Sequence, residues 1–364
     1  MTKREKSPYR RLVVKIGSNV LTRQDGTLDI TRICSLVDQL AMLHAEGIEC
    51  IVISSGAVAA GRSELPGGRK LDSVSARQLF SAVGQAKLIN RYYDFFRERG
   101  IVCGQVLTTK ESLSTRDHYL NQKNCMETML RSGVIPILNE NDTISVTELM
   151  FTDNDELAGL VSTMMGADAL IILSNIDGIY DGNPGSGEAQ LIREVYPETS
   201  DLARFIRTER SSFGRGGMLT KSRIARKVAA EGIEVVIACG RRDGILVDLA
   251  AGKEVPCTRF IPSEHPVSGV KKWIAHSEGF AKGIIHINQG ALEALTGPTA
   301  TSLLPIGVVR VEGDFDRGDI VRIVGPEGEP IGVGQVSTDS IHAAQTAGRK
   351  GLRPLIHYDY LFLD

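Results

Sequence analysis

The stretch LVVKIGSN at residues 12–19 is an apolar, β-branched run that predicts a buried strand ending in a glycine. Further runs of the same kind follow it, separated by segments with apolar residues at helical spacing. Strands that are apolar on both faces and alternate with helices predict a mostly parallel sheet between two helix layers, the three-layer αβα sandwich of the α/β class. The strands are expected at Leu12–Ile16, Cys50–Ile53, Val102–Leu107, Val134–Leu138, Ala169–Leu173 and Val235–Ala238.

Two of the intervening segments show the clearest helical periodicity. Each carries an apolar stripe three or four residues apart, which predicts an amphipathic helix against the sheet. The stripes are Ile33, Leu36, Val37, Leu40 and Leu43, and Leu157, Leu160, Val161, Met164 and Met165.

The C-terminal third has a different pattern. Pro256, Pro262 and Pro266 interrupt the alternation, and short strands separated by Gly and Pro turns follow. The segment Gly325–Pro330 has the composition of a hairpin loop. A small, compact β-rich domain is therefore expected, with strands at Ala281–Ile287, Gly307–Val311, Ile320–Val324 and Ile331–Val336.

Composition narrows the function classes. The 364 residues include 42 basic and 44 acidic side chains, a balance that does not favour a protein built around nucleic acid. No apolar run approaches the roughly 20 residues that a membrane span requires. The six cysteines lack the spacing of a zinc site, so we expect structural thiols in a reducing compartment, a cytoplasmic protein, and no metal site built from its own side chains.

The first candidate site lies at the end of the first strand. A lysine inside an apolar strand is unusual because an unpaired buried ammonium is costly, and Gly17 after Lys15 allows backbone N–H groups to approach an anion. Together these residues predict a phosphate-binding turn. The alternative is an edge strand with Lys15 in solvent.

Two more strands end in polar turns. Ile53 is followed by Ser54, Ser55 and Gly56 at the expected start of a helix, where anions bind favourably. The alternative there is N-capping by one of the two serines. The run Asn139–Asp142 follows the strand at 134–138, and its carboxylates and amides could bind an ammonium and a carboxylate. The alternative is a polar turn.

Two later segments complete the set. Thr152–Glu156 opens a helix; Thr152 and Asp155 fit a capping pattern, while the charge density suits orienting lysines or magnesium. Gly214–Lys221 is a glycine-rich loop that delivers a lysine to a helix start. It matches neither a Walker A loop nor the GxGxxG dinucleotide motif, and the protein-kinase signatures are absent.

This set resembles the amino-acid kinase family. The resemblance is carried by VVKIGS, SSGAVAAG, NEND, TDNDEL and GRGGMLTK, which occur in the family's order from Lys15 to Lys221. The run from Ser302 to Val309 and the segment Phe315–Asp319 resemble a PUA domain. That combination is similar to the branch that phosphorylates glutamate; aspartokinases carry ACT domains instead, and acetylglutamate, carbamate and uridylate kinases usually end after the kinase domain. The resemblance implies a kinase domain at 1–258, a linker at 259–275 and a PUA-like domain at 276–364.

The resemblance also implies roles for individual residues. Lys15 and Lys221 would contact the transferring phosphoryl group while Asp155 holds both lysines. Gly17 and Gly56 would supply backbone N–H groups. The acceptor would bind to Ser55, Asp142 and Asn154, and ATP to Lys15, Gly17, Ser174, Asn175, Arg215, Gly216, Gly217, Met218, Leu219, Thr220 and Lys221.

Three positions depart from the family pattern. Ser174-Asn175 stands where many relatives have Thr-Asp, Ser18 stands where Thr is frequent, and Arg215 replaces a small residue. The first and third concern nucleotide contacts, and none touches the residues assigned to chemistry.

The implied activity is a phosphotransferase with a carboxyl group as acceptor. It would use ATP and Mg²⁺ to phosphorylate the γ-carboxylate of L-glutamate in proline biosynthesis, with proline as feedback inhibitor, a homo-oligomeric assembly and a downstream glutamyl-phosphate reductase. The alternatives are a kinase of the same fold acting on UMP or acetylglutamate, or RNA binding through the PUA-like domain. Acidic residues interleave with Arg310, Arg317 and Arg322 there, which does not predict a uniform basic face.

Overall fold

The computed structural model describes residues 7–65, 71–109, 111–113, 116–144, 154–182, 189–197, 217–264, 281–297 and 301–363. The chain forms two compact units, which are described separately. The first comprises Met1–Thr109 and Gln122–Pro266, and the second Lys110–Asn121 and Val267–Asp364. The domain limits expected from the sequence stay a prediction, because most of the expected linker lies outside the described residues.

The first unit is built on an eight-stranded sheet in the order β3-β4-β2-β1-β5-β9-β10-β8. The six neighbouring strands from β3 to β9 are parallel, and β10 runs antiparallel to β9. The mostly parallel sheet is therefore confirmed. Its strands are β1 Arg11–Ile16, β2 Glu49–Ser54, β3 Val102–Thr108, β4 Val134–Glu140, β5 Ala169–Ser174, β8 Glu194–Val195, β9 Glu234–Cys239 and β10 Cys257–Phe260.

All six predicted strands are present, each longer by one or two residues in total. The sequence did not predict β10, because this short run lies between Pro256 and Pro262 and reads as the start of a linker. A separate ribbon of β6 Ile179–Tyr180 and β7 Leu191–Ile192 was also not predicted.

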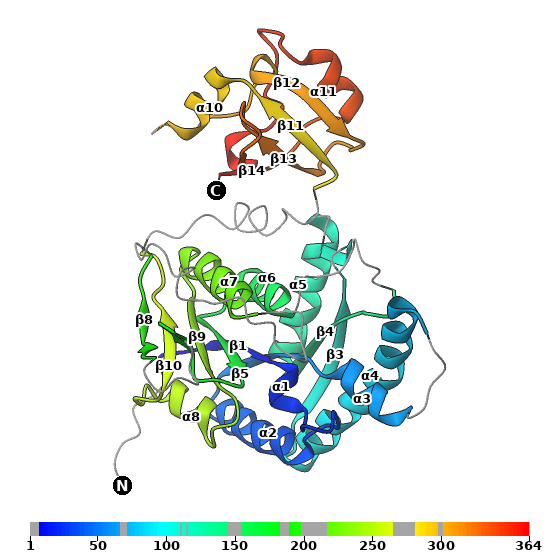
Figure 1. Cartoon of the computed structure of the whole chain (residues 1–364), viewed down its shortest axis with the longest axis vertical. Helices are drawn as coiled ribbons and strands as arrows, with labels where there is room; N and C mark the ends of the chain where they lie inside the picture. Colours follow the sequence, from blue (N-terminus) through cyan, green and yellow to red (C-terminus); the bar gives the residue numbers. More distant parts are fainter. Residues whose placement is uncertain are drawn as a thin grey trace. The chain divides into compact units, whose positions relative to one another are not determined.

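Helices cover both faces of this sheet, with α5, α6 and α7 on one side and α2, α3, α4 and α8 on the other (Figure 1). The two predicted apolar stripes are buried, one on α2 and one on α6. The three-layer αβα sandwich is thus confirmed. The helices are α1 Ser18–Leu21, α2 Ile30–Ala45, α3 Ala57–Glu64, α4 Ser73–Glu98, α5 Arg116–Arg131, α6 Asn154–Met165, α7 Met218–Ala230 and α8 Ile245–Ala250. The residues of α5 before Gln122, and a 3-10 turn at Glu111–Leu113, are assigned to the second unit.

The alternation of side chains along β1 decides where Lys15 points. Leu12, Val14 and Ile16 belong to the core that α2 and α8 cover. Successive side chains of a strand point to opposite faces, so Lys15 faces the layer of α6 and α7. Both neighbours of β1 are strands, which makes β1 central, and the edge-strand alternative for Lys15 is wrong.

The second unit contains a five-stranded mixed sheet in the order β12-β11-β13-β14-β15. Only the β11–β13 pair is parallel among its neighbours. The four predicted strands and the β13–β14 hairpin are confirmed, and β15 was not predicted. The elements are β11 Gly283–Ile287, α10 Gln289–Thr296, β12 Val308–Gly313, β13 Ile320–Val324, β14 Pro330–Gln335, α11 Ser340–Thr346 and β15 Leu361–Leu363, with 3-10 turns at Pro305–Gly307 and Tyr358–Tyr360.

Charges of both signs meet on the second unit. Lys282 lies 3.1 Å from Asp319, and Arg310 pairs with Glu312. This agrees with the interleaved charges of the sequence. All six cysteines of the chain are free thiols. Within the described ranges, no helix combines the length and apolar character needed to span a membrane.

Candidate active site

The carboxyl ends of the parallel strands bring the predicted residues to one edge of the sheet. Strands β4, β2, β1, β5 and β9 are consecutive neighbours there. Asn139 and Glu140 end β4, Ser55 follows β2, Gly17 follows β1 and Ser174 ends β5. In open α/β sheets, this edge is where ligands bind. The residues predicted for the acceptor therefore lie on one side of β1, and those predicted for the nucleotide at β5 lie on the other.

A buried cluster of three charged residues marks the centre of this edge. The Nζ of Lys15 lies 2.7 Å from Oδ1 of Asp155, and the Nζ of Lys221 lies 2.9 Å from its Oδ2. Asp155 is in the first turn of α6 and Lys221 is in the first turn of α7. Two helix N-termini thus meet the end of β1, and each favours negative charge nearby.

Within this cluster, one carboxylate is paired with two lysines. Asp155 is fully buried, and the Lys15 and Lys221 side chains are 5% and 12% exposed. Burial alone would raise the pKa of Asp155, but the two lysines outweigh it and lower this pKa from 3.8 to about 2. One carboxylate therefore faces two ammonium groups at neutral pH, and an incoming anion is electrostatically favoured.

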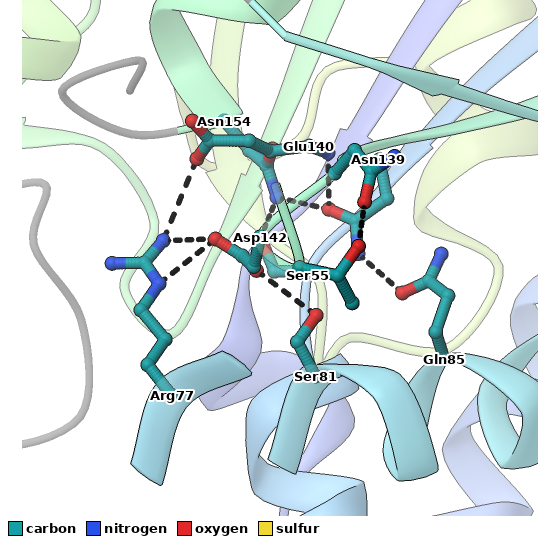
Figure 2. A network of polar contacts seen from close by, with 10 residues as sticks. Ser55, Arg77, Ser81, Gln85, Asn139, Glu140, Asp142 and Asn154 are labelled. Carbon is teal, nitrogen blue, oxygen red and sulfur yellow. Dashed lines mark hydrogen bonds and ion pairs between the residues drawn. The ribbon is translucent and has the colours of Figure 1, made fainter. Parts of the chain in front are cut away.

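A network of amides and hydroxyls lies on the acceptor side (Figure 2). The Nδ2 of Asn154 donates to Ser55 Oγ at 3.0 Å and to Asn139 Oδ1 at 2.9 Å. The backbone N–H of Glu140 also donates to Asn139 Oδ1, at 2.9 Å. Among the described residues, the buried Oδ1 of Asn154 has no hydrogen-bond partner, which leaves an acceptor for a ligand.

Helix α4 contributes a row of side chains that the sequence reasoning missed (Figure 2). Arg77 Nε donates to Asp142 Oδ1 at 2.8 Å, and Ser81 Oγ donates to Asp142 Oδ2 at 3.4 Å. Gln85 Oε1 accepts from Asn139 Nδ2 at 2.9 Å. These three residues are four apart and extend the buried stripe of Leu88, Tyr92 and Phe96. Polar residues within a buried helical stripe were the signal that could have revealed them.

Close packing of two helices holds this row in place. Gly84 of α4 touches α3 so tightly that an added Cβ would lie 1.8 Å from the carbonyl oxygen of Ala57. A Cβ on Gly61 would lie equally close to the carbonyl oxygen of Phe80. Both positions therefore require glycine, and the SSGAVAAG turn has a packing role besides its place at the sheet edge.

The residues predicted for the nucleotide are only partly described. Ser174 is buried at the end of β5, its Oγ accepts from the N–H of Ile176 at 3.3 Å, and Asn175 beside it is exposed. Gly217 precedes α7, and Met218–Lys221 form its first turn. Arg215 and Gly216 lie outside the described residues.

The two glycines expected to present N–H groups differ. The N–H of Gly17 donates to the carbonyl of Leu173 at 3.1 Å, so it is engaged within the sheet edge. Gly56 has φ of +104°, a conformation that favours glycine, and it begins α3. Their assignment to phosphate stays a prediction, and for Gly17 it requires this hydrogen bond to open.

The structure also bears on the capping and turn alternatives for Ser54, Ser55 and the run 139–142. Helix α3 has no side-chain N-cap; Ser55 Oγ instead accepts from Asn154, and Ser54 Oγ lies 2.9 Å from the Tyr92 hydroxyl. Asn139 and Glu140 belong to β4 and Asp142 lies in the turn that follows it; all three are buried, so the run 139–142 is more than a polar turn. The capping alternative for Thr152 lies outside the described residues.

Comparisons with known proteins agree with this geometry. The family model "Amino acid kinase family" matches residues 10–239, and the PUA domain model matches residues 283–357. A glutamate 5-kinase of Bacteroides thetaiotaomicron is 62% identical, with 99% of this chain and 100% of the relative covered. One of Chlorobaculum tepidum is 48% identical over 98% of each chain. One of Trichlorobacter lovleyi is 39% identical over 96% and 93%.

Solved structures support the fold alone. The crystal structure of an isopentenyl phosphate kinase substrate complex matches with a TM-score of 0.50 at 18% identity, covering 69% of this chain and 99% of that one. The full-length relatives, the family models and the lysine–aspartate–lysine cluster at the sheet edge lead to one conclusion. This chain belongs to the amino acid kinase family and carries a C-terminal PUA domain.

Proposed function

We propose that the chain is a glutamate 5-kinase, which transfers the γ-phosphoryl group of ATP to the γ-carboxylate of L-glutamate. The products are L-glutamyl 5-phosphate and ADP, in the first step of proline biosynthesis. The observation that carries the proposal is the Lys15–Asp155–Lys221 cluster, whose position at β1 separates the acceptor residues from those at β5. The full-length relatives named glutamate 5-kinase support the choice of acceptor.

The chemistry suits this arrangement of charges. A carboxylate acceptor is ionised at neutral pH, so the reaction needs no general base. An oxygen of the γ-carboxylate attacks the γ-phosphorus, and the bond to the oxygen shared with the β-phosphate breaks as ADP leaves. Charge on the transferring oxygens is then stabilised by Lys15 and Lys221, which Asp155 keeps in position.

The remaining predicted residues divide between the two substrates. Ser55, Asp142 and Asn154 would bind the amino acid on the β2–β4 side. Ser174, Asn175 and residues 215–221 would bind ATP on the β5 side. The ordered hydrogen bonds on the acceptor side support a preformed pocket, since four hydrogen bonds already join five of its residues.

Magnesium belongs to the proposal as an ion carried by the nucleotide. In the part of the chain that the structure describes, no three His, Cys, Asp or Glu side chains are grouped to hold a metal ion. This suits Mg²⁺, which keeps several waters and binds largely through substrate phosphates. When bound, it would neutralise phosphate charge, while the lysines act on the transferring group.

Four further expectations accompany the proposed activity. They are feedback inhibition by proline, a homo-oligomeric assembly, a cytoplasmic location, and delivery of the product to a glutamyl-phosphate reductase. The last follows from chemistry, because an acyl phosphate is reactive towards water and a reductase that consumes it promptly limits that loss.

The proposal is tested by measuring ADP release with magnesium-ATP and hydroxylamine. The acceptors are glutamate, aspartate, N-acetylglutamate, carbamate and UMP. Glutamate-dependent ADP release with an equal yield of hydroxamate is the expected result, because hydroxylamine traps acyl phosphates. ADP release with UMP or N-acetylglutamate, and none with glutamate, would retain the phosphate site and overturn the proposed acceptor.

A further inference from the structure

The row of α4 side chains formed by Arg77, Ser81 and Gln85 (the α4 row) supplies a cation, Arg77, to the acceptor side. Arg77 donates from Nε and Nη2 to Oδ1 of Asp142, and its Nη2 also lies 3.5 Å from Oε2 of Glu140. The Arg77 side chain is 22% exposed, whereas those of Asp142 and Glu140 are 8% and 4% exposed. The Arg77 side chain is thus the most exposed of the three in this ion-paired group.

The charges of this group match the α-carbon end of an amino acid. An amino acid presents an ammonium and a carboxylate on the same carbon. Asp142, assigned above to the acceptor, is a partner for the ammonium, and a guanidinium binds carboxylates in a planar, two-pronged geometry. Without substrate, Arg77 and Asp142 satisfy each other. With substrate, each could take the opposite charge of the ligand.

The position of the pair along the sheet edge fits the same assignment. Asp142 follows β4, which lies two strands from β1 in the sheet. Adjacent strands are about 4.8 Å apart, so β4 and β1 are separated by about 10 Å. An acceptor whose α-carbon end lies at β4 would extend its distal carboxylate over β2, towards the phosphoryl group at β1.

We propose that Arg77 is a specificity-determining residue that binds the α-carboxylate of the amino-acid acceptor, exchanging its ion pair with Asp142 for contacts to the ligand. The inference rests on the proposed function and adds to it the group that recognises the acceptor's α-carboxylate.

The test compares two acceptors that differ only at this carboxylate. L-Glutamate has it, and isoglutamine, the α-amide, retains the ammonium and the distal carboxylate but loses the negative charge. The ratio of kcat/KM for the two is measured by hydroxamate formation, or as a ratio of binding constants by competition where turnover is slow. It is measured in the wild-type chain, in Arg77→Met and in Arg77→Lys.

We expect the wild-type chain to prefer glutamate by about ten- to a hundredfold, the range for a hydrogen bond to a charged group. In Arg77→Met the ratio should fall to near one, because glutamate loses its partner while isoglutamine loses little. Arg77→Lys retains the charge without the two-pronged geometry and should lie between. Arg91→Met, an exposed arginine later on α4, is the matched control and should keep the wild-type ratio.

A merely structural role for Arg77 gives a different result. If the arginine only positions Asp142, its removal weakens both acceptors by the same factor and the ratio persists, which overturns the inference. If Arg77→Met binds neither acceptor, Arg77→Lys decides the matter: an undiminished ratio there would also overturn it. If the wild-type chain uses glutamate and isoglutamine equally well, the inference about Arg77 is wrong but the proposed kinase activity stands. A chain inactive with glutamate sinks the proposed function itself.

Discussion

Buried polar groups find their partners in different ways at the centre of the sheet edge and on its acceptor side. At the centre, full charges are paired in a water-poor site, with Asp155 between Lys15 and Lys221. On the acceptor side, neutral amides and hydroxyls hold one another beside an ion-paired group, in which Arg77 is more exposed than Asp142 and Glu140. The centre suits stabilising a charge that appears only during reaction, whereas the acceptor side suits reading a ligand's shape and charge.

The largest effect is expected from removing the negative charge of Asp155 at the centre of the sheet edge. Asp155→Asn leaves two buried ammonium groups facing each other, so the free energy of unfolding should fall by about 3–5 kcal/mol, as when one partner of a buried ion pair is lost. Chemical denaturation measures the loss. ATP should restore more stability to the variant than to the wild-type chain, because its phosphates return negative charge.

The control for this experiment is Asp94→Asn, which removes the same charge from an exposed site on α4. Surface substitutions usually change stability by less than about 0.5 kcal/mol. If Asp155→Asn were as mild as Asp94→Asn, the central cluster would not be held together by charge.

The next largest effect should come from the lysines. Lys15→Ala or Lys221→Ala is expected to lower kcat by about a hundredfold or more, some 2.7 kcal/mol of transition-state stabilisation. The KM for glutamate should change little, because neither lysine belongs to the acceptor pocket. Arg223→Ala, at an exposed position two residues after Lys221 on α7, is the control. Near-normal turnover in a folded lysine variant would contradict the assignment.

A substitution of Asp142 tests the role of the acceptor side. Asp142→Asn retains the shape of the side chain and removes its charge, so the KM for glutamate should rise by about ten- to a hundredfold with a smaller change in kcat. Steady-state kinetics with varied glutamate and saturating ATP measure both. A large fall in kcat at unchanged KM would instead place Asp142 with the reacting groups.

The centre and the acceptor side also differ in how far their functional residues could be predicted from the sequence. Lys15 stood out because a lysine inside an apolar strand conflicts with the local pattern, and the parallel order of strands then explains its place at the centre. Its pairing with Asp155 and Lys221 joins residues far apart in the chain. That pairing depends on how α6 and α7 pack. The charge density of residues 152–156 suggested contacts with lysines or magnesium, and the family resemblance named the two lysines.

The α4 row shows the opposite case. Arg77, Ser81 and Gln85 continue the helical spacing of the buried residues Leu88, Tyr92 and Phe96, but this spacing alone does not show which residues of other elements they contact. Their role depends on the close packing of α3 against α4 at Gly61 and Gly84, a contact between two helices joined by a segment outside the described residues. Likewise β10 was missed because its partner β9 is supplied by tertiary structure.

The stability that the charge of Asp155 gives to the folded state should depend on pH in the acid range. Because the pKa of Asp155 falls from 3.8 to about 2 on folding, its charge stabilises the folded state fully above pH 4. This contribution, on the order of 2 kcal/mol, is lost as the pH falls from about 4 towards about 2. Denaturation at several pH values should show a shallower acid dependence in Asp155→Asn. Equal slopes in the two proteins would contradict the lowered pKa.

The smallest expected effect tests whether the acceptor side needs its support from α4. Gln85→Met removes the acceptor for Asn139 Nδ2, while Asn139 Oδ1 keeps its bonds from Glu140 and Asn154. The loss of one such bond, about 0.5–1.5 kcal/mol, should raise the KM for glutamate by about two- to tenfold and leave kcat unchanged. Gln85→Glu keeps an oxygen at the same place and should preserve most of the affinity. If both variants lose affinity equally, the hydrogen bond is not the cause, and an unchanged KM in Gln85→Met would mean that Asn139 is oriented by β4 and α6 alone.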